Sequence, residues 1–128
     1  SNGGTSQVTR GDFVFSTTDP VGLTVDGLSI FVASNTSDDQ TVADFVAYWN
    51  AHPVAKLLAT ATADTSGAES YGILTFLDSN VHTVVAYSPA TADVTGITNT
   101  TAAVAATRPV AGTIHQVDTG GVYVRFID

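Results

Sequence analysis

An Asp-Gly pair between two alternating apolar runs constrains the fold of this chain more than any other feature. The apolar residues of the two runs are Val21, Leu23, Val25, Leu28, Ile30 and Val32. Asp26-Gly27 between them favours a two-residue β-turn, because both turn positions require positive φ. With this turn, Val25 lies opposite Leu28, and the pairing continues outward along both strands. All six side chains then share one face of a hairpin, which another element must cover.

The segment after the hairpin has the pattern of an amphipathic helix. Four apolar residues follow the i, i+3, i+4, i+7 spacing of one helix face: Val42, Phe45, Val46 and Trp49. We expect Thr41 to be the N-cap with Asp44 in a reciprocal capping arrangement, and Asp38-Asp39 to add negative charge at the helix start. Pro53 predicts the end of the helix, since the residue before a proline avoids the helical region.

Further apolar runs predict more strands. Runs 57–62, 71–77 and 81–87 follow the helix, and the last two are apolar at nearly every position. We therefore expect 71–77 and 81–87 to be central strands covered on both faces. The stretch 88–109 is predicted as the least regular segment, with a possible helical turn at 101–106 and a role as an interaction surface.

The last part of the chain predicts a second hairpin. Its strands would be 112–117 and 122–127, with a turn at Thr119-Gly120. Val117 then lies opposite Val122, and His115 lies opposite Val124. The expected fold class is α+β, a mainly antiparallel β-sheet or sandwich with one amphipathic helix packed on it. We expect an N-terminal arm at 1–11, either a flexible leader or an arm that docks on an adjacent subunit. A single β-rich domain is expected at 12–128.

Part of this pattern resembles a known module. The matching residues are Val25-Asp26-Gly27, Ile30, Thr41, Asp44, Trp49-Asn50, Ala59, Ala61, Leu74 and Phe76. Together they resemble the hook-IN type insertion domain, which recurs in bacterial flagellar filament and cap proteins and in structural proteins of tailed phages. The resemblance covers less than half of the chain, and Tyr48 and Trp49 stand where such domains usually have small residues. It implies a structural role in an assembly.

Composition and charge disfavour several classes of function. Twelve acidic residues against four basic ones give a net charge of −8. Binding to nucleic acid or to an anionic membrane surface needs clustered Lys and Arg, so neither is expected. The chain has no Cys, which excludes disulfides, thiolate catalysis and zinc-thiolate sites. No apolar run approaches the roughly 18 residues of a membrane-spanning helix.

The ionisable residues do not form a known catalytic or metal motif. We expect His52 to cap the end of the helix, and His82 and His115 to be exposed or hydrogen-bonded strand residues. Most aspartates lie at turns and caps. Asp38-Asp39 beside Asn35 could gather oxygen ligands for Ca²⁺, although the spacing is not that of an EF-hand. No other cofactor and no catalytic residue is predicted, and the chain is not expected to be an enzyme. A small hydrolase would need a pocket in which a histidine meets an Asp or Ser.

Exposed aromatic and basic residues are the candidates for contacts with other subunits. Trp49 lies on the apolar helix face and is predicted to be core. Tyr48, Tyr123, Arg10 and Arg108 are the predicted interface residues. Lys56, together with an Asn or Asp and with Glu69, could form an adhesin-type intramolecular isopeptide bond, which is testable because the chain has a single Lys and a single Glu.

The sequence therefore favours a structural function. We expect a self-assembling subunit or decoration protein of a phage virion, in its capsid or tail, or of an extracellular filament. Its partners would be copies of itself and other virion or filament proteins. The alternative is a carbohydrate- or surface-binding module of an adhesin or secreted enzyme, which exposed coplanar aromatic rings would support.

Overall fold

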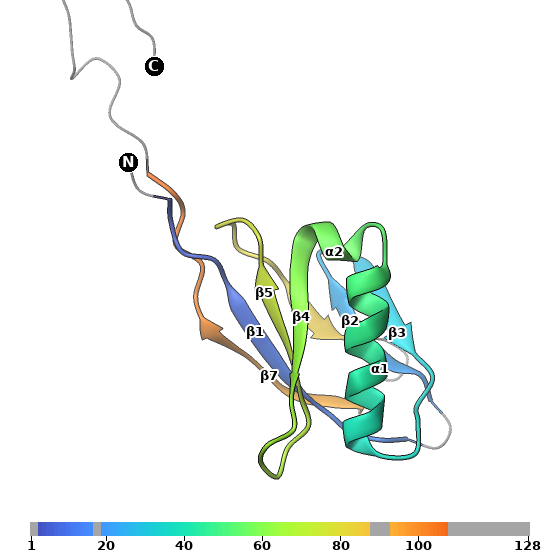
Figure 1. Cartoon of the computed structure of the whole chain (residues 1–128). Helices are drawn as coiled ribbons and strands as arrows, with labels where there is room; N and C mark the ends of the chain where they lie inside the picture. Colours follow the sequence, from blue (N-terminus) through green and yellow to red (C-terminus); the bar gives the residue numbers. More distant parts are fainter. Residues whose placement is uncertain (1–2, 17–18, 88–92, 108–128) are drawn as a thin grey trace, which may run out of the picture.

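The part of the chain that the structure describes folds into two antiparallel β-sheets and one main helix around a shared core, which is the predicted α+β class (Figure 1). The computed structural model describes residues 3–16, 19–87 and 93–107. The strands within these residues are β1 (Val8–Phe13), β2 (Val21–Val25), β3 (Leu28–Val32), β4 (Ala59–Asp64), β5 (Tyr71–Phe76), β6 (Val84–Ala86) and β7 (Val94–Thr101). The helices are α1 (Asp38–Ala51) and the short α2 (Ala55–Leu58).

The two sheets and α1 enclose one core. The larger sheet has the order β4-β5-β1-β7, and the smaller sheet has the order β3-β2-β6. Helix α1 packs against β4, an edge strand of the larger sheet, and against β3, an edge strand of the smaller sheet (Figure 1). The largest buried side chains come from both sheets and from the helix: Phe13, Leu23, Ile30, Phe45, Trp49, Leu74 and Phe76.

The first hairpin has the predicted turn, register and buried face. Asp26 and Gly27 both have positive φ, at 50° and 87°. Val25 pairs with Leu28, and the pairing continues outward to Val21 and Val32. The inward side chains are buried or packed against the core, so the alternation in the sequence correctly predicted which face is covered.

Helix α1 buries the predicted face but begins earlier than predicted. Val42, Phe45 and Trp49 are buried, and Val46 packs against them. The N-cap is Ser37, whose Oγ accepts a hydrogen bond from the Gln40 amide, so the prediction of Thr41 as N-cap is wrong. Ser37 and Gln40 have the Ser-x-x-Gln spacing of a capping box, which explains the earlier start. Thr41 is buried in the first turn, and its hydroxyl donates to the Ser37 carbonyl.

The C-terminal end of α1 covers the outer edge of strand β4. The Trp49 indole Nε1–H donates to the Ala59 carbonyl oxygen at 2.8 Å. The Asn50 side chain donates to the Ala61 carbonyl and accepts from the Ala61 amide, at 2.9 and 3.0 Å. An uncovered strand edge can pair with another chain, because its backbone N–H and C=O groups are free. Trp49 and Asn50 form hydrogen bonds with these groups of β4, so they are not available for such pairing.

Several predictions for the segments after α1 are wrong. The run 57–62 is a strand only from Ala59 onward, because Leu57 and Leu58 belong to α2. The run 81–87 does not form a central strand: β6 spans only Val84–Ala86, it is an edge strand, and Val81 and Val85 are 79% and 49% exposed. The run 71–77 does contain a central strand, β5, which pairs with β4 and β1. Only one face of β5 is buried, that of Gly72, Leu74 and Phe76, so the prediction that both faces are covered is wrong. The helical turn predicted at 101–106 is absent. Residues 94–101 form strand β7 on β1, so the prediction of 88–109 as the least regular segment is also wrong for this part. The β-branched Thr, Val and Ile residues of this stretch favour a strand.

The N-terminal segment pairs within its own chain. Strand β1 begins at Val8, inside the range predicted as an arm, and is central in the larger sheet. Ahead of it, Thr5 and Val104 exchange two backbone hydrogen bonds. We call residues 3–6 and 102–107 the stem, because they leave the sheets side by side (Figure 1). The predicted second hairpin at 112–127 lies outside the described residues.

Candidate functional site

His82 is held between two aspartates that are distant in sequence. Its Nδ1 lies 2.5 Å from Asp26 Oδ2, in the turn between β2 and β3. Its Nε2 lies 2.7 Å from Oδ1 of Asp78, which is four residues earlier in the chain. The ring stacks on Phe76 with the centroids 4.1 Å apart and the planes 6° apart. The His82 side chain is only 7% exposed, so its contacts are with the protein.

The two carboxylates favour the charged form of the imidazole. Burial opposes that charge, but the hydrogen bonds and charges of Asp26 and Asp78 outweigh it and raise the pKa of His82 above its usual value. Burial likewise opposes the charge of Asp26, yet hydrogen bonds from His82 and from the Thr83 amide lower its pKa. Two hydrogen bonds, one from the His82 ring and one from the Asn80 backbone amide, lower the pKa of Asp78.

The buried side-chain amide of Gln7 holds the backbone of His82. The Gln7 side chain accepts from the His82 amide at 2.9 Å and donates to the His82 carbonyl at 3.0 Å. Its Nε2 also lies 2.8 Å from the Thr9 hydroxyl, which donates to Asn99 Oδ1 at 2.7 Å. The cluster therefore joins β1, the β2–β3 turn, the β5–β6 loop and β7.

This geometry describes a structural tie rather than an acid–base site. Both ring nitrogens of His82 are engaged by carboxylates, so neither faces a position that a substrate could occupy. His82 was expected to be an exposed or a hydrogen-bonded strand residue; it is hydrogen-bonded, but it lies in the loop before β6 and not in a strand. The i, i+4 spacing of Asp78 and His82 is a weak sequence signal for their contact. Nothing in the sequence marks Asp26 as the second partner, because only the fold brings the β2–β3 turn to this loop.

The residues considered for calcium bind separate groups of the protein. Asp38 Oδ1 accepts from the Phe15 amide at 2.6 Å, and Asp39 Oδ1 accepts from the Ser70 hydroxyl at 2.5 Å. The side-chain amide of Asn35 donates to Asp44 Oδ2 at 2.7 Å. Within residues 3–16, 19–87 and 93–107, no group of three or more His, Cys, Asp and Glu side chains has a metal-binding arrangement.

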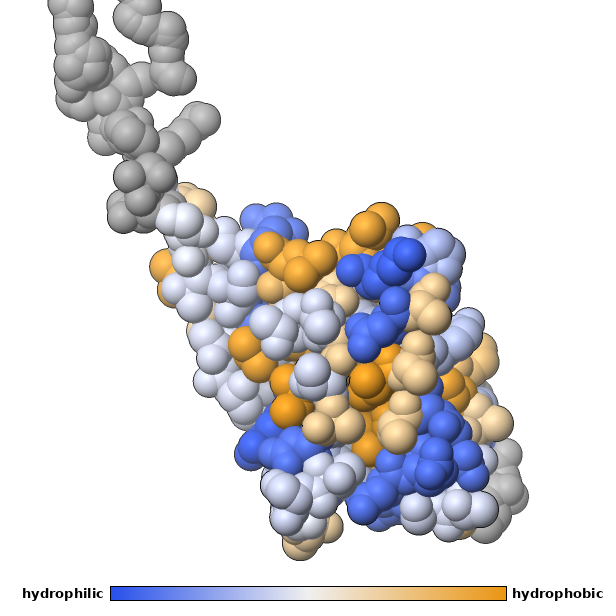
Figure 2. Space-filling view, viewed as in Figure 1, coloured by the Kyte–Doolittle hydropathy of each residue, from blue (hydrophilic) through white to orange (hydrophobic). Residues whose placement is uncertain are grey.

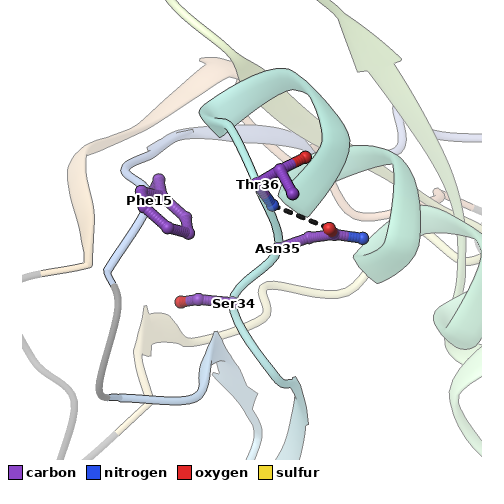
Figure 3. A pocket seen from close by; sticks show the side chains of 4 residues that line it. All are labelled: Phe15, Ser34, Asn35 and Thr36. Carbon is purple, nitrogen blue, oxygen red and sulfur yellow. Dashed lines mark hydrogen bonds between the residues drawn. The ribbon is translucent and has the colours of Figure 1, made fainter.

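An open hollow lies beside the segment that joins β3 to α1. Phe15 faces Ser34, Asn35 and Thr36 across it (Figure 3). Its polar side chains already have partners: Asn35 Oδ1 accepts from the Thr36 amide at 2.7 Å, and the Ser34 hydroxyl donates to the Asp19 carbonyl at 2.8 Å. The hollow therefore offers a small ligand one aromatic ring and few free polar groups.

The remaining predicted chemistry is structural or separated in space. His52 does end helix α1, but its Nδ1 accepts from the Val54 and Ala55 amides and so caps the start of α2. Lys56 lies before β4 and Glu69 lies before β5. These are opposite ends of an antiparallel strand pair, so the fold does not bring Lys56 and Glu69 together.

Two of the four predicted interface residues lie within the described part of the chain. Tyr48 is 47% exposed on α1, where its ring meets the His52 ring edge-on at 5.9 Å. Arg10 lies on β1 with its guanidinium 4.2 Å from the centre of the Tyr71 ring. Tyr123 and Arg108 lie outside the described residues. Trp49 is fully buried, as predicted.

Large aliphatic side chains are exposed at one end of the domain. Leu57, Leu77, Val81 and Val104 are 70%, 59%, 79% and 57% exposed, and we call this set the apolar end. The Leu77 amide donates to the Leu58 carbonyl, which places Leu77 beside the Leu57 segment. The Ala106 amide lies 3.3 Å from the Ser79 hydroxyl, which places the stem segment with Val104 beside the loop between Leu77 and Val81. Figure 2 shows apolar side chains at the end of the domain where α2 lies, next to polar ones. Sequence reasoning missed this surface, since it placed run 81–87 in the core.

A second exposed apolar group lies on the outer face of the smaller sheet. The Phe31 and Tyr87 rings stack with centroids 4.2 Å apart and planes 18° apart. They meet over Gly22, which pairs with Phe31 and accepts a hydrogen bond from the Tyr87 amide. A Cβ at Gly22 would overlap the Ile30 carbonyl and the Phe31 backbone, so only glycine fits beneath the pair.

Comparison with known proteins assigns no family. No protein family model matches this chain, and no curated protein is significantly similar to it. Among the described residues, neither helix is long and apolar enough to cross a membrane.

Proposed function

We propose that this protein is a structural subunit that acts through contacts with copies of itself and with neighbouring proteins of a larger particle. A phage capsid or tail, or an extracellular filament, is the particle that this role implies. The apolar end carries the proposal, because Leu57, Leu77 and Val81 present aliphatic side chains to solvent. Apolar surface that gathers on one part of a protein marks an interaction site more often than scattered apolar residues do.

The use of the polar residues supports the same proposal. His82, Asp26 and Asp78 hold loops together, and Trp49 and Asn50 cover a strand edge. These interactions stabilise the domain and leave none of the five side chains free to act on a substrate. The resemblance to hook-IN type domains points in the same direction, because such domains are parts of flagellar and phage structures.

A sugar-binding role gains no support from the described aromatic residues. Recognition of a sugar ring needs aromatic faces that are open to solvent and roughly coplanar. Trp49 is buried, Phe31 and Tyr87 stack on each other, and Tyr71 lies beneath the Arg10 guanidinium. Tyr48 is exposed, but its ring meets the His52 ring edge-on. We therefore favour assembly over carbohydrate binding.

Light scattering and electron microscopy of the purified full chain test this proposal. Particles larger than a single 13.1-kDa chain, or regular filaments and rings, are the expected result. A chain that scatters as a monomer and binds a glycan would overturn the proposal in favour of the alternative.

A further inference from the structure

The loop that joins β5 to β6 carries two residues of the apolar end. Leu77 begins this loop, and Val81 lies directly before His82. The backbone is fixed on both sides, by hydrogen bonds of the Leu77 amide and of the His82 amide. Residues 78–81 therefore span the distance from one fixed point to the other.

Two side-chain hydrogen bonds among the described residues connect segment 78–81 to the rest of the domain. The Asp78 carboxylate meets the ring of His82 at 2.7 Å. The Ser79 hydroxyl accepts from the Ala106 amide of the stem at 3.3 Å. If the first contact is lost, the stem alone holds the segment through a side chain.

The contact between Asp78 and the ring requires a proton on both ring nitrogens. Nδ1 lies 2.5 Å from Asp26 and Nε2 lies 2.7 Å from Asp78, and an ionised carboxylate can only accept hydrogen bonds. The imidazolium ion donates from both nitrogens, whereas neutral imidazole has one N–H and one lone pair. In the neutral form one of the two aspartates therefore faces a lone pair at hydrogen-bond distance and must move away.

Asp78 is the aspartate that moves. Asp26 is held a second time, because its other oxygen accepts from the Thr83 amide at 2.9 Å. The Asp26 side chain is 39% exposed and that of Asp78 is 51% exposed, so water solvates Asp78 more readily. The hydrogen bonds that Asp78 accepts from Asn80 lie within the same turn and move with it. The one proton of neutral His82 then stays on Nδ1, toward Asp26.

The two carboxylates set the charge of the ring. The other described side chains of the buried cluster are neutral: Phe76 of β5, Gln7 of β1 and Asn99 of β7. Burial opposes the charged ring, but Asp26 and Asp78 raise its pKa above the usual value of 6.5. The ring therefore carries its second proton below about pH 6.5 and loses it as the pH rises through the raised pKa.

We propose that the contact of His82 with Asp78, which we call the latch, makes assembly through the apolar end dependent on pH. In the charged form the ring holds segment 78–81 in place, so that Leu77 and Val81 present one fixed apolar surface. In the neutral form Asp78 leaves the ring, the segment loosens, and assembly weakens. This inference rests on the proposed assembly function and adds the regulation of the same surface.

Sedimentation velocity of the full chain at about pH 5.5 and at about pH 8, at equal ionic strength, tests the latch with two variants. In D78N an amide replaces the carboxylate, and an amide can accept from the charged ring or donate to the neutral one. The variant therefore keeps the contact at both pH values, and the half-exposed position tolerates the change. D64N removes the same charge at the end of β4 that lies away from α2, and it leaves the latch intact.

We expect the natural chain and D64N to associate about fivefold more strongly at the lower pH, and D78N to associate equally at both. Hydrogen–deuterium exchange of residues 78–81 measures the latch itself, at a dilution where the chain is monomeric. After correction for the intrinsic exchange rate, protection of these amides should decrease with rising pH in the natural chain and in D64N, and should stay constant in D78N.

Two results would overturn the latch and leave the assembly proposal standing: oligomers whose proportion is the same at both pH values, or a D78N chain that depends on pH as strongly as D64N does. Monomers at every concentration and both pH values would overturn the assembly proposal and, with it, the regulatory role of the latch, even if the exchange of residues 78–81 still changed with pH.

Discussion

Replacing Trp49 by Phe tests how the helix closes the larger sheet. The change keeps an aromatic ring in the core but removes the indole N–H that donates to the buried Ala59 carbonyl. An unsatisfied buried acceptor costs about 1–3 kcal/mol. The smaller ring also leaves a void, for which we add about 1 kcal/mol. We expect W49F to lower the free energy of unfolding by about 2–4 kcal/mol.

Equilibrium unfolding in urea measures this loss. With a slope of about 1.5 kcal/mol per molar urea, the midpoint should fall by about 2 M. The matched control is Y48F, which removes a hydroxyl from the exposed neighbouring residue and should change stability by less than about 0.5 kcal/mol. A W49F midpoint indistinguishable from that of Y48F would refute the role of the indole in covering β4.

Two further predictions follow from the glycine under the aromatic pair and from the histidine cluster. G22A should destabilise the domain by about 2–3 kcal/mol in urea unfolding, because the added Cβ meets backbone atoms of Ile30 and Phe31, whereas G67A, with open space around it, should have little effect. Equal midpoints for the two variants would contradict the close approach at Gly22. His82 has a raised pKa, so its stabilising charge is complete below about pH 6.5 and is lost as the pH rises through the folded pKa. The urea midpoint of the natural chain should therefore decrease as the pH is raised from 5.5 to 8. The midpoint of H82Q should decrease less over the same range. Parallel pH profiles of the two chains would show that the cluster does not bind the proton as described.

Local patterns predicted the fold well where a single element determines the outcome. The Asp26-Gly27 turn fixes its own register, and the apolar spacing of α1 selects its buried face. The helix start was misplaced because Thr41 and Ser37 are both good capping residues, and only the structure shows which hydroxyl accepts from a first-turn amide.

Contacts between distant segments were not predictable from the sequence. Run 81–87 has the composition of a central strand, yet tertiary contacts place β6 at a sheet edge and expose Val81. The cluster around His82 depends on Gln7 and Asp26, which lie far from it in the chain. No local pattern encodes these contacts, since they arise from the arrangement of the two sheets.

Sedimentation velocity of the natural chain and of L77D tests the central claim most directly. Leu77 is 59% exposed, so a charge there should leave the fold intact while disrupting any contact at the apolar end. T65D, which adds the same charge to the exposed loop at the opposite end of β4, is the control. We expect the natural chain and T65D to sediment as oligomers whose proportion rises with concentration, and L77D to sediment as a folded monomer. If all three chains sediment as monomers, or if L77D assembles as well as T65D, the apolar end is not an assembly surface.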